Sequence, residues 1–105
     1  MELQYYLDSK GKCPFKLWLN EVDIALRARI LARLARVATG NFGDSRPVGL
    51  GVYELRFFYG GGLRVYFGIN HHGTVVLLGG VKASQSRDIY QAQSFWLDYL
   101  ERVNE

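Results

Sequence analysis

The sequence has few of the residues that build cross-links and metal centres. Cys13 is its single cysteine, so no disulfide can form within the chain. One thiol and the adjacent His71 and His72 cannot supply the four ligands of a structural zinc site, and we expect neither a metal nor another cofactor. A chain without disulfides is typical of the reducing cytoplasm, which is where we expect it.

Long apolar runs are also absent. No stretch approaches the roughly 18 consecutive apolar residues of a membrane helix, and residues 1–6 lack the basic-then-apolar layout of a secretory signal. We therefore expect no membrane contact. Apolar residues nevertheless make up 49% of the 105 residues, and aromatic ones 14%, which is enough for a core. This predicts one folded domain over residues 1–105.

Negative charge is in deficit. The 13 basic residues, most of them arginines, outnumber the 10 acidic ones and give a formal charge of +3. The planar arginine side chain matches phosphate geometry better than the point charge of lysine does. An acidic partner is therefore plausible, and nucleic acid is the commonest one.

Residue periodicity predicts the secondary structure. Residues 3–7 form an apolar and aromatic run typical of a strand at a sheet edge. Helical spacing follows over residues 14–22, where Pro14 suits a first turn, and over 23–38, whereas the glycines and prolines of 41–51 predict a loop. Residues 52–59, 63–69 and 74–78 are β-rich and closely linked, so they should pair as antiparallel strands, and a last helix is expected over 85–103.

The resulting order is β-α-α-β-β-β-α, which predicts an α+β domain. We expect a small, twisted, mainly antiparallel sheet with two N-terminal helices and a C-terminal helix, all packed on one face of the sheet. The adjacent histidines fall in a turn between an asparagine and a glycine, and we interpret them as turn residues rather than as an acid–base pair.

Two groups of basic residues invite functional interpretation. Alternation puts Arg56 and Arg64 on one sheet face, interleaved with Phe58 and Tyr66, where they could hold phosphates and stack bases. The alternative is a surface ion pair of either arginine with Glu54. In the second helix, Arg29, Arg33 and Arg36 lie opposite the apolar stripe and form either a basic surface or an ordinary solvated face. Lys82, Gln85 and Arg87 lie near the start of the last helix, where backbone N–H groups favour an anion.

Several segments, in order, resemble the RelE/ParE toxin superfamily, and most closely its branch of HigB-like, phage-derived addiction module killer proteins. The similarity covers nearly the whole chain. It is carried by Gly40-Asn41-Phe42-Gly43-Asp44, Pro47-Val48-Gly49, Gly51-Val52-Tyr53-Glu54-Leu55-Arg56, Gly62-Leu63-Arg64-Val65-Tyr66, and Leu77-Leu78-Gly79-Gly80-Val81-Lys82-Ala83-Ser84-Gln85 with Asp88-Ile89.

The resemblance implies a RelE-like fold and the activity of a toxin from a toxin–antitoxin pair. Relatives that cleave RNA cut messenger RNA in the ribosomal A site without a metal. The implied chemistry is attack of a ribose 2′-hydroxyl on the adjacent phosphate, with cations neutralising the phosphorane. The implied partners are messenger RNA on the ribosome and a helix-turn-helix antitoxin that forms an oligomeric complex with the toxin.

Site residues are carried over by motif. The resemblance implies catalytic roles for Arg64, Arg56 and Lys82, a place in the catalytic site for Tyr90 as a base-stacking residue, and RNA-binding roles for Arg46 and Gln85. The residue pattern adds Arg87 and Tyr66 as RNA-binding candidates. The chain departs from the branch at Val81, where an aspartate is usual, and at Gly61 and Leu63, where proline and tyrosine are usual. Two alternatives stay open, a ParE-like gyrase inhibitor without ribonuclease activity and an inactive relative that binds only the antitoxin.

Overall fold

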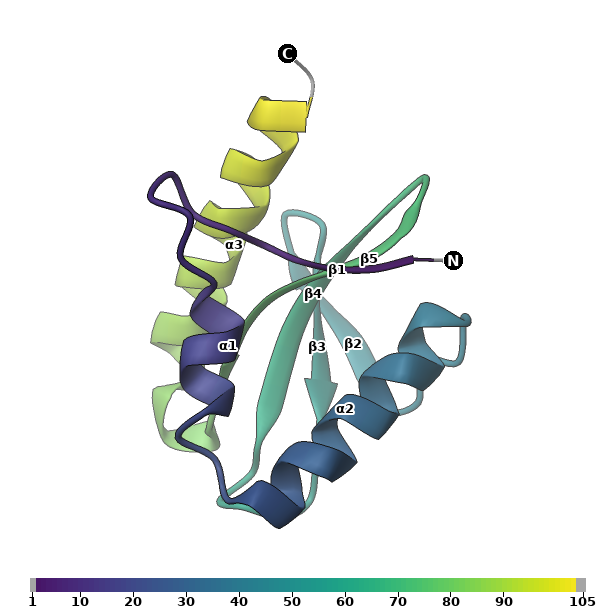
Figure 1. Cartoon of the computed structure of the whole chain (residues 1–105), viewed down its shortest axis with the longest axis vertical. Coiled ribbons are helices and arrows are strands. Elements are labelled where there is room, and N and C mark those ends of the chain that lie inside the picture. Colours follow the sequence, from purple (N-terminus) through teal and green to yellow (C-terminus); the bar gives the residue numbers. More distant parts are fainter. Residues whose placement is uncertain (1, 104–105) are drawn as a thin grey trace.

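The computed structural model describes residues 2–103, whose strands form one twisted sheet with helices around it (Figure 1). The elements in chain order are β1 (Glu2–Tyr5), α1 (Pro14–Leu19), α2 (Ile24–Ala38), β2 (Ser45–Gly49), β3 (Val52–Arg56), β4 (Arg64–Asn70), β5 (Gly73–Gly80), the 3₁₀ helix η1 (Lys82–Ser84) and α3 (Gln85–Val103). The predicted α+β class is confirmed, as are a first helix that starts at Pro14 and a last helix that starts at Gln85.

The sheet has the strand order β1-β5-β4-β3-β2. As predicted, β3, β4 and β5 pair antiparallel in sequence, and β1 lies at an edge. The sheet is mixed, because β1 runs parallel to β5. The prediction of a loop over residues 41–51 was wrong in part, since β2 pairs antiparallel with β3 at the other edge. An edge strand tolerates Pro47, which has no N–H to donate, so the composition of this segment concealed a strand.

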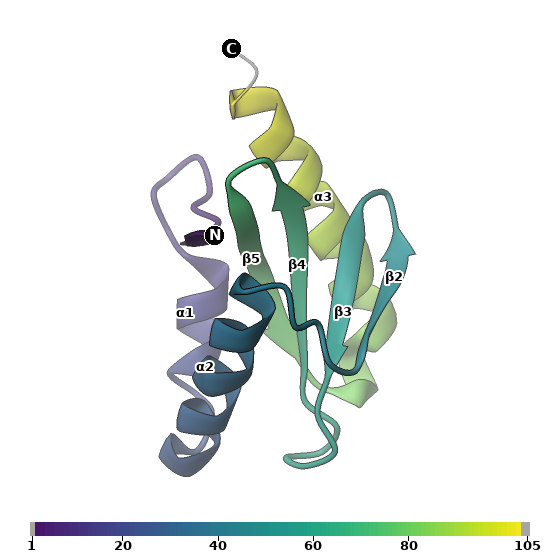
Figure 2. The same cartoon turned by 90° about the vertical axis from the view of Figure 1, so that its right-hand side faces the viewer.

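Helices cover both faces of the sheet, and the expectation that all of them pack on one face was wrong (Figure 2). Helices α1 and α2 pack on one face, over a core that includes Phe15, Ile30 and Leu55. Helix α3 packs on the other face, where Trp96 meets the buried Tyr66. The central strands carry large apolar side chains on both faces, and a sheet of this kind must be covered twice.

Two tryptophans pack against the sheet where its strands carry glycine. On one face, a Cβ added at Gly79 would lie 2.1 Å from Cε3 of Trp18, which belongs to α1. On the other face, a Cβ added at Gly68 would lie 2.5 Å from Cε3 of Trp96, which belongs to α3. Each indole therefore occupies the space that a strand side chain would need, and this brings both helices close to the sheet.

The two ends of the sheet carry different connections between strands. The β3–β4 connection lies at the end where α3 begins, and the β4–β5 turn lies near the end of α3 (Figure 2).

Within residues 2–103, none of the helices has the length and apolar character needed to cross a membrane.

Candidate anion-binding site

Three basic side chains from different elements meet at the end of the sheet that holds the β3–β4 connection. Arg56 is the last residue of β3, Arg64 is the first of β4, and Lys82 is the first of η1. The β3–β4 register places Arg56 and Arg64 directly opposite each other. All three line a hollow of about 240 Å³, which is completed by Phe57, Phe58 and Gly62. The sequence pattern predicted Arg56 and Arg64 on one sheet face and Lys82 in a separate segment, and the structure brings all three to one hollow.

Each of the two arginines has its own acidic partner. Like charges directly opposite each other in a sheet repel. Arg56 donates from Nη2 to Oδ1 of Asp44 over 2.9 Å, and Nε of Arg64 lies 3.4 Å from Oε2 of Glu54. Of the ion pairs considered for Glu54, the pair with Arg64 is present, but it is buried rather than at the surface.

Glu54 is fully buried, and four of the predicted site residues converge on its carboxylate. Nε of Arg46 donates to Oε1 over 3.1 Å. The hydroxyl of Tyr66 and the amide of Gln85 donate to Oε2 over 3.1 and 2.9 Å, the same oxygen that Arg64 approaches. Both oxygens are therefore engaged, as a buried carboxylate requires.

Arg64 is held more tightly than its alternating pattern suggested. Its side chain is only 11% exposed, and Nη1 donates to the carbonyl oxygen of Gly62 over 2.7 Å. The expectation that this arginine points from an open sheet face was wrong, because α3 packs on that face. The hydrogen bond from Nη1 to Gly62 and the charge of Glu54 beside Nε hold the guanidinium at the hollow before any ligand arrives.

Tyr66 cannot stack an RNA base in this structure, because it is fully buried under α3. Burial raises the pKa of its phenol, and the nearby charge of Glu54 raises that pKa further. Tyr66 therefore stays protonated and serves as a hydrogen-bond donor to Glu54. In place of the predicted RNA-binding role, Tyr66 supports the carboxylate of Glu54 by a hydrogen bond.

The remaining predicted residues lie outside the hollow. Tyr90 is 76% exposed on α3, and Arg87 is exposed with its Nε 3.7 Å from Oδ1 of Asp88. Neither lines the space between the three cations. His71 and His72 are exposed in the β4–β5 turn, as predicted.

Two arginines of α2 lie against aromatic rings of the β3–β4 connection. The guanidinium of Arg33 lies 4.7 Å from the ring centroid of Phe57, and that of Arg29 lies 5.1 Å from the ring of Tyr59. Arg36 is exposed. This helix face therefore contributes to packing around the connection, a role that neither sequence interpretation included.

One other residue was missed as part of the site. Asp44 was not predicted to pair with Arg56. Phe58 was expected beside the arginines as a ring that could stack a base, and it projects into solvent with 89% of its surface exposed. Glu54 was considered only as a surface partner, although its position among basic strand residues was the available signal.

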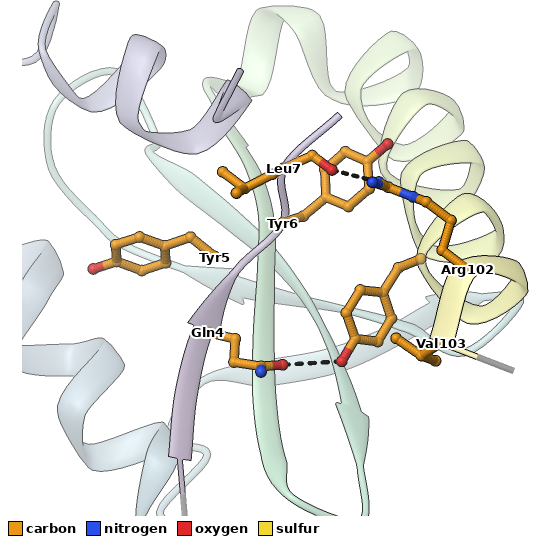
Figure 3. A pocket seen from close by; sticks show the side chains of 7 residues that line it. Gln4, Tyr5, Tyr6, Leu7, Arg102 and Val103 are labelled. Atoms are coloured by element: carbon orange, nitrogen blue, oxygen red, sulfur yellow. Dashed lines mark hydrogen bonds between the residues drawn. The ribbon is translucent and has the colours of Figure 1, made fainter. Parts of the chain in front are cut away.

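A second hollow, of about 360 Å³, lies where β1 meets the end of α3 (Figure 3). Its polar groups satisfy one another. The hydroxyl of Tyr99 donates to Oε1 of Gln4 over 2.9 Å, and Nη2 of Arg102 donates to Asp98 over 2.6 Å and also to the carbonyl oxygen of Leu7. These bonds fasten α3 to the N-terminal segment.

Across residues 2–103, no three His, Cys, Asp or Glu side chains are grouped so as to hold a metal ion.

Comparison with known proteins identifies a relative of unknown activity. No protein-family model matches the chain, and no solved structure matches it. A Haemophilus influenzae (strain ATCC 51907 / DSM 11121 / KW20 / Rd) protein described as an uncharacterized protein is 43% identical over 87 residues, which cover 80% of this chain and 87% of that protein. The chain therefore belongs to the same family as this Haemophilus influenzae protein.

Proposed function

We propose that this protein is the toxin of a toxin–antitoxin pair and that it cleaves messenger RNA on the translating ribosome. The observation that carries the proposal is the meeting of Arg56, Arg64 and Lys82 around one hollow. Resemblance to the RelE/ParE superfamily independently implies catalytic roles for these three residues. An RNA phosphodiester is an anion that three convergent cations would bind and whose pentacovalent transition state they would stabilise.

The three basic side chains differ in how firmly neighbouring groups hold them. Arg64 is fixed by Glu54 and Gly62, and Arg56 is held by Asp44. Lys82 is exposed and carries a compact charge on a flexible stem. We assign the fixed arginines to orienting the phosphate. We assign Lys82 to stabilising the negative charge that develops as the 2′-oxygen bonds to phosphorus and the bond from phosphorus to the 5′-oxygen breaks, with the 2′-hydroxyl proton passing to water and water protonating the departing 5′-oxygen. Donors positioned in advance stabilise a transition state without paying for rearrangement.

The residues outside the hollow take other proposed roles. Arg46, Arg87 and Tyr90 are exposed, and we propose that they contact RNA on either side of the cleaved bond. Gln85 donates to Glu54, so we propose that it acts through that carboxylate. In this proposal the fold is RelE-like, the protein acts in the cytoplasm, and no metal takes part in the cleavage.

A cognate partner follows from the same proposal. The RelE/ParE resemblance implies a small helix-turn-helix antitoxin that binds the toxin in an oligomeric complex. The net charge of +3 favours capture by an acidic protein segment, because complementary charges accelerate association. Coexpression of an adjacent small reading frame should suppress growth arrest by this chain.

The test is brief induction in cells, followed by mapping of RNA ends. Translated transcripts should be cut, and the same transcripts with a disabled start site should survive. The Lys82→Ala variant, altered at an exposed side chain, should leave both intact. Intact transcripts together with broken or relaxed DNA would instead identify a gyrase inhibitor, and harmless expression would identify an inactive relative.

A further inference from the structure

Phe58 is an exposed aromatic residue at the edge of the cation-lined hollow. It is 89% exposed, whereas the adjacent Phe57 is 3% exposed in the core. Phe58 lines the same hollow as Arg56, Arg64 and Lys82. A single exposed aromatic ring needs no explanation by itself, but a ring joined to three cations offers two different kinds of contact within one small site.

We propose that this site takes one unpaired nucleotide of single-stranded RNA, with the phosphate against the three cations and the base stacked on Phe58. The inference rests on the proposed function and specifies the form of its substrate. A nucleotide is an anion joined to a flat aromatic group, and the site presents cations beside a flat aromatic ring. The base must be unpaired, because a base inside a duplex already has neighbours stacked on both of its faces.

The site should tolerate any base. Every base offers a π face to an aromatic ring, and the hollow is lined by positive charge and aromatic surface, with Gly62 contributing no side chain. Apolar docking of a protein segment is less suited to this hollow, because three of the six residues that line it are cations.

The position of Phe58 also makes it a suitable target for substitution. It projects into solvent, so its replacement removes little packing. Phe58→Ala removes the stacking surface, whereas Phe58→Tyr keeps a ring of the same size. Leu97, which is 58% exposed on α3, provides a matched control through Leu97→Ala.

The experiment measures binding of short RNAs by calorimetry at low salt. The probes are a single-stranded oligoribonucleotide, the same strand with its central base removed, and its duplex. Phe58→Ala should weaken binding of the intact single strand about tenfold and should leave binding of the abasic strand and the duplex unchanged. Phe58→Tyr and Leu97→Ala should bind all three RNAs as the wild type does.

Two further outcomes separate this inference from the proposed function. If Phe58→Ala binds the intact strand as tightly as the wild type, or loses equal affinity for the abasic strand, the stacking role is overturned while RNA binding by the cations stands. If the wild type binds none of the RNAs, the inference fails. Translation-dependent cleavage would then show that the proposed function survives without it.

Discussion

Arg64 reaches diagonally across the β3–β4 pair to Glu54, with 3.4 Å between Nε and Oε2, although the residue directly opposite it is Arg56. One of the three cations of the hollow is thus positioned by a carboxylate that has no contact with solvent. Removal of the charge of Glu54 should therefore disturb Arg64 directly.

Lys82→Ala should slow cleavage strongly without affecting the fold. The side chain is exposed, so the free energy of unfolding should change by less than about 0.5 kcal/mol, while loss of a cation at the reacting phosphate should slow cleavage about a hundredfold or more. Cleavage of translated RNA and thermal melting would be measured together. Arg36→Ala removes an equally exposed cation from α2 and serves as the control. Equal cleavage by the two variants would contradict the assignment.

Arg64→Ala should destabilise the protein as well as inactivate it. The substitution leaves buried Glu54 with three donors instead of four contacts, which should cost about 2 kcal/mol or more of unfolding free energy. Denaturant titration checks this value. Arg64→Lys keeps the charge but loses the planar fork, so it should recover part of the stability and little of the activity. An Arg64→Ala protein as stable as the wild type would show that the buried pair contributes nothing.

Glu54→Gln should be far more harmful than Asp44→Asn, although each neutralises the acidic partner of an arginine. The Glu54 side chain has no exposure, whereas that of Asp44 is 31% exposed. We expect a loss of about 2 kcal/mol or more for Glu54→Gln and of less than about 1 kcal/mol for Asp44→Asn. Chemical denaturation of both variants tests the comparison. Equal losses would indicate that burial does not govern the strength of these pairs.

Stability should fall at alkaline pH through two buried tyrosines. Burial, helped by Asp98, raises the pKa of Tyr6 to about 12, and burial with Glu54 raises that of Tyr66. A raised folded pKa favours the protonated phenol, so this stabilisation is complete below about pH 10, where unfolded tyrosine titrates. It should be lost as the pH rises from there through the folded pKa values. Unfolding free energies measured across this range should decline less steeply for Tyr6→Phe and Tyr66→Phe, and an unchanged slope in both would contradict the mechanism.

Gly68→Ala should destabilise the domain by about 1–3 kcal/mol, because the added methyl group overlaps the indole of Trp96. Thermal and denaturant melting give the loss. Trp96→Phe supplies the control, since a smaller ring leaves room for the methyl group. The double variant should be more stable than the sum of the two single losses predicts, whereas simple additivity would place the two groups out of contact.

Local pattern was sufficient for most of the elements. Period-two alternation and short turns predicted β3, β4 and β5 and their pairing, and helical spacing predicted α2 and α3. Strand β2 was missed because its pairing depends on the backbone of β3, whereas its own residues include Pro47 and Gly49. The arrangement of layers was wrong because the face that α3 covers is decided by contacts far apart in the sequence, such as Trp96 over Gly68.

The sequence predicted some parts of the candidate site correctly and others not. Alternation put Arg56 and Arg64 on neighbouring strands, and the cross-strand register confirms it. Alternation does not show whether a sheet face is exposed to solvent or covered by a helix. Tyr66 was therefore expected to be exposed, but it is buried. The buried position of Glu54 depends on hydrogen bonds from Arg46 in strand β2 and Gln85 in helix α3. No local sequence pattern relates these two residues to Glu54.

Helices on both faces of the sheet restrict how a long polymer can reach the cations. The sheet faces are closed by α1 and α2 on one side and by α3 on the other (Figure 2). An RNA strand bound at the proposed site must therefore cross the end of the sheet and cannot run along it. Under the proposed function, the protein would then contact only the few nucleotides at this end of the sheet, and the ribosome would set the path of the strand beyond them.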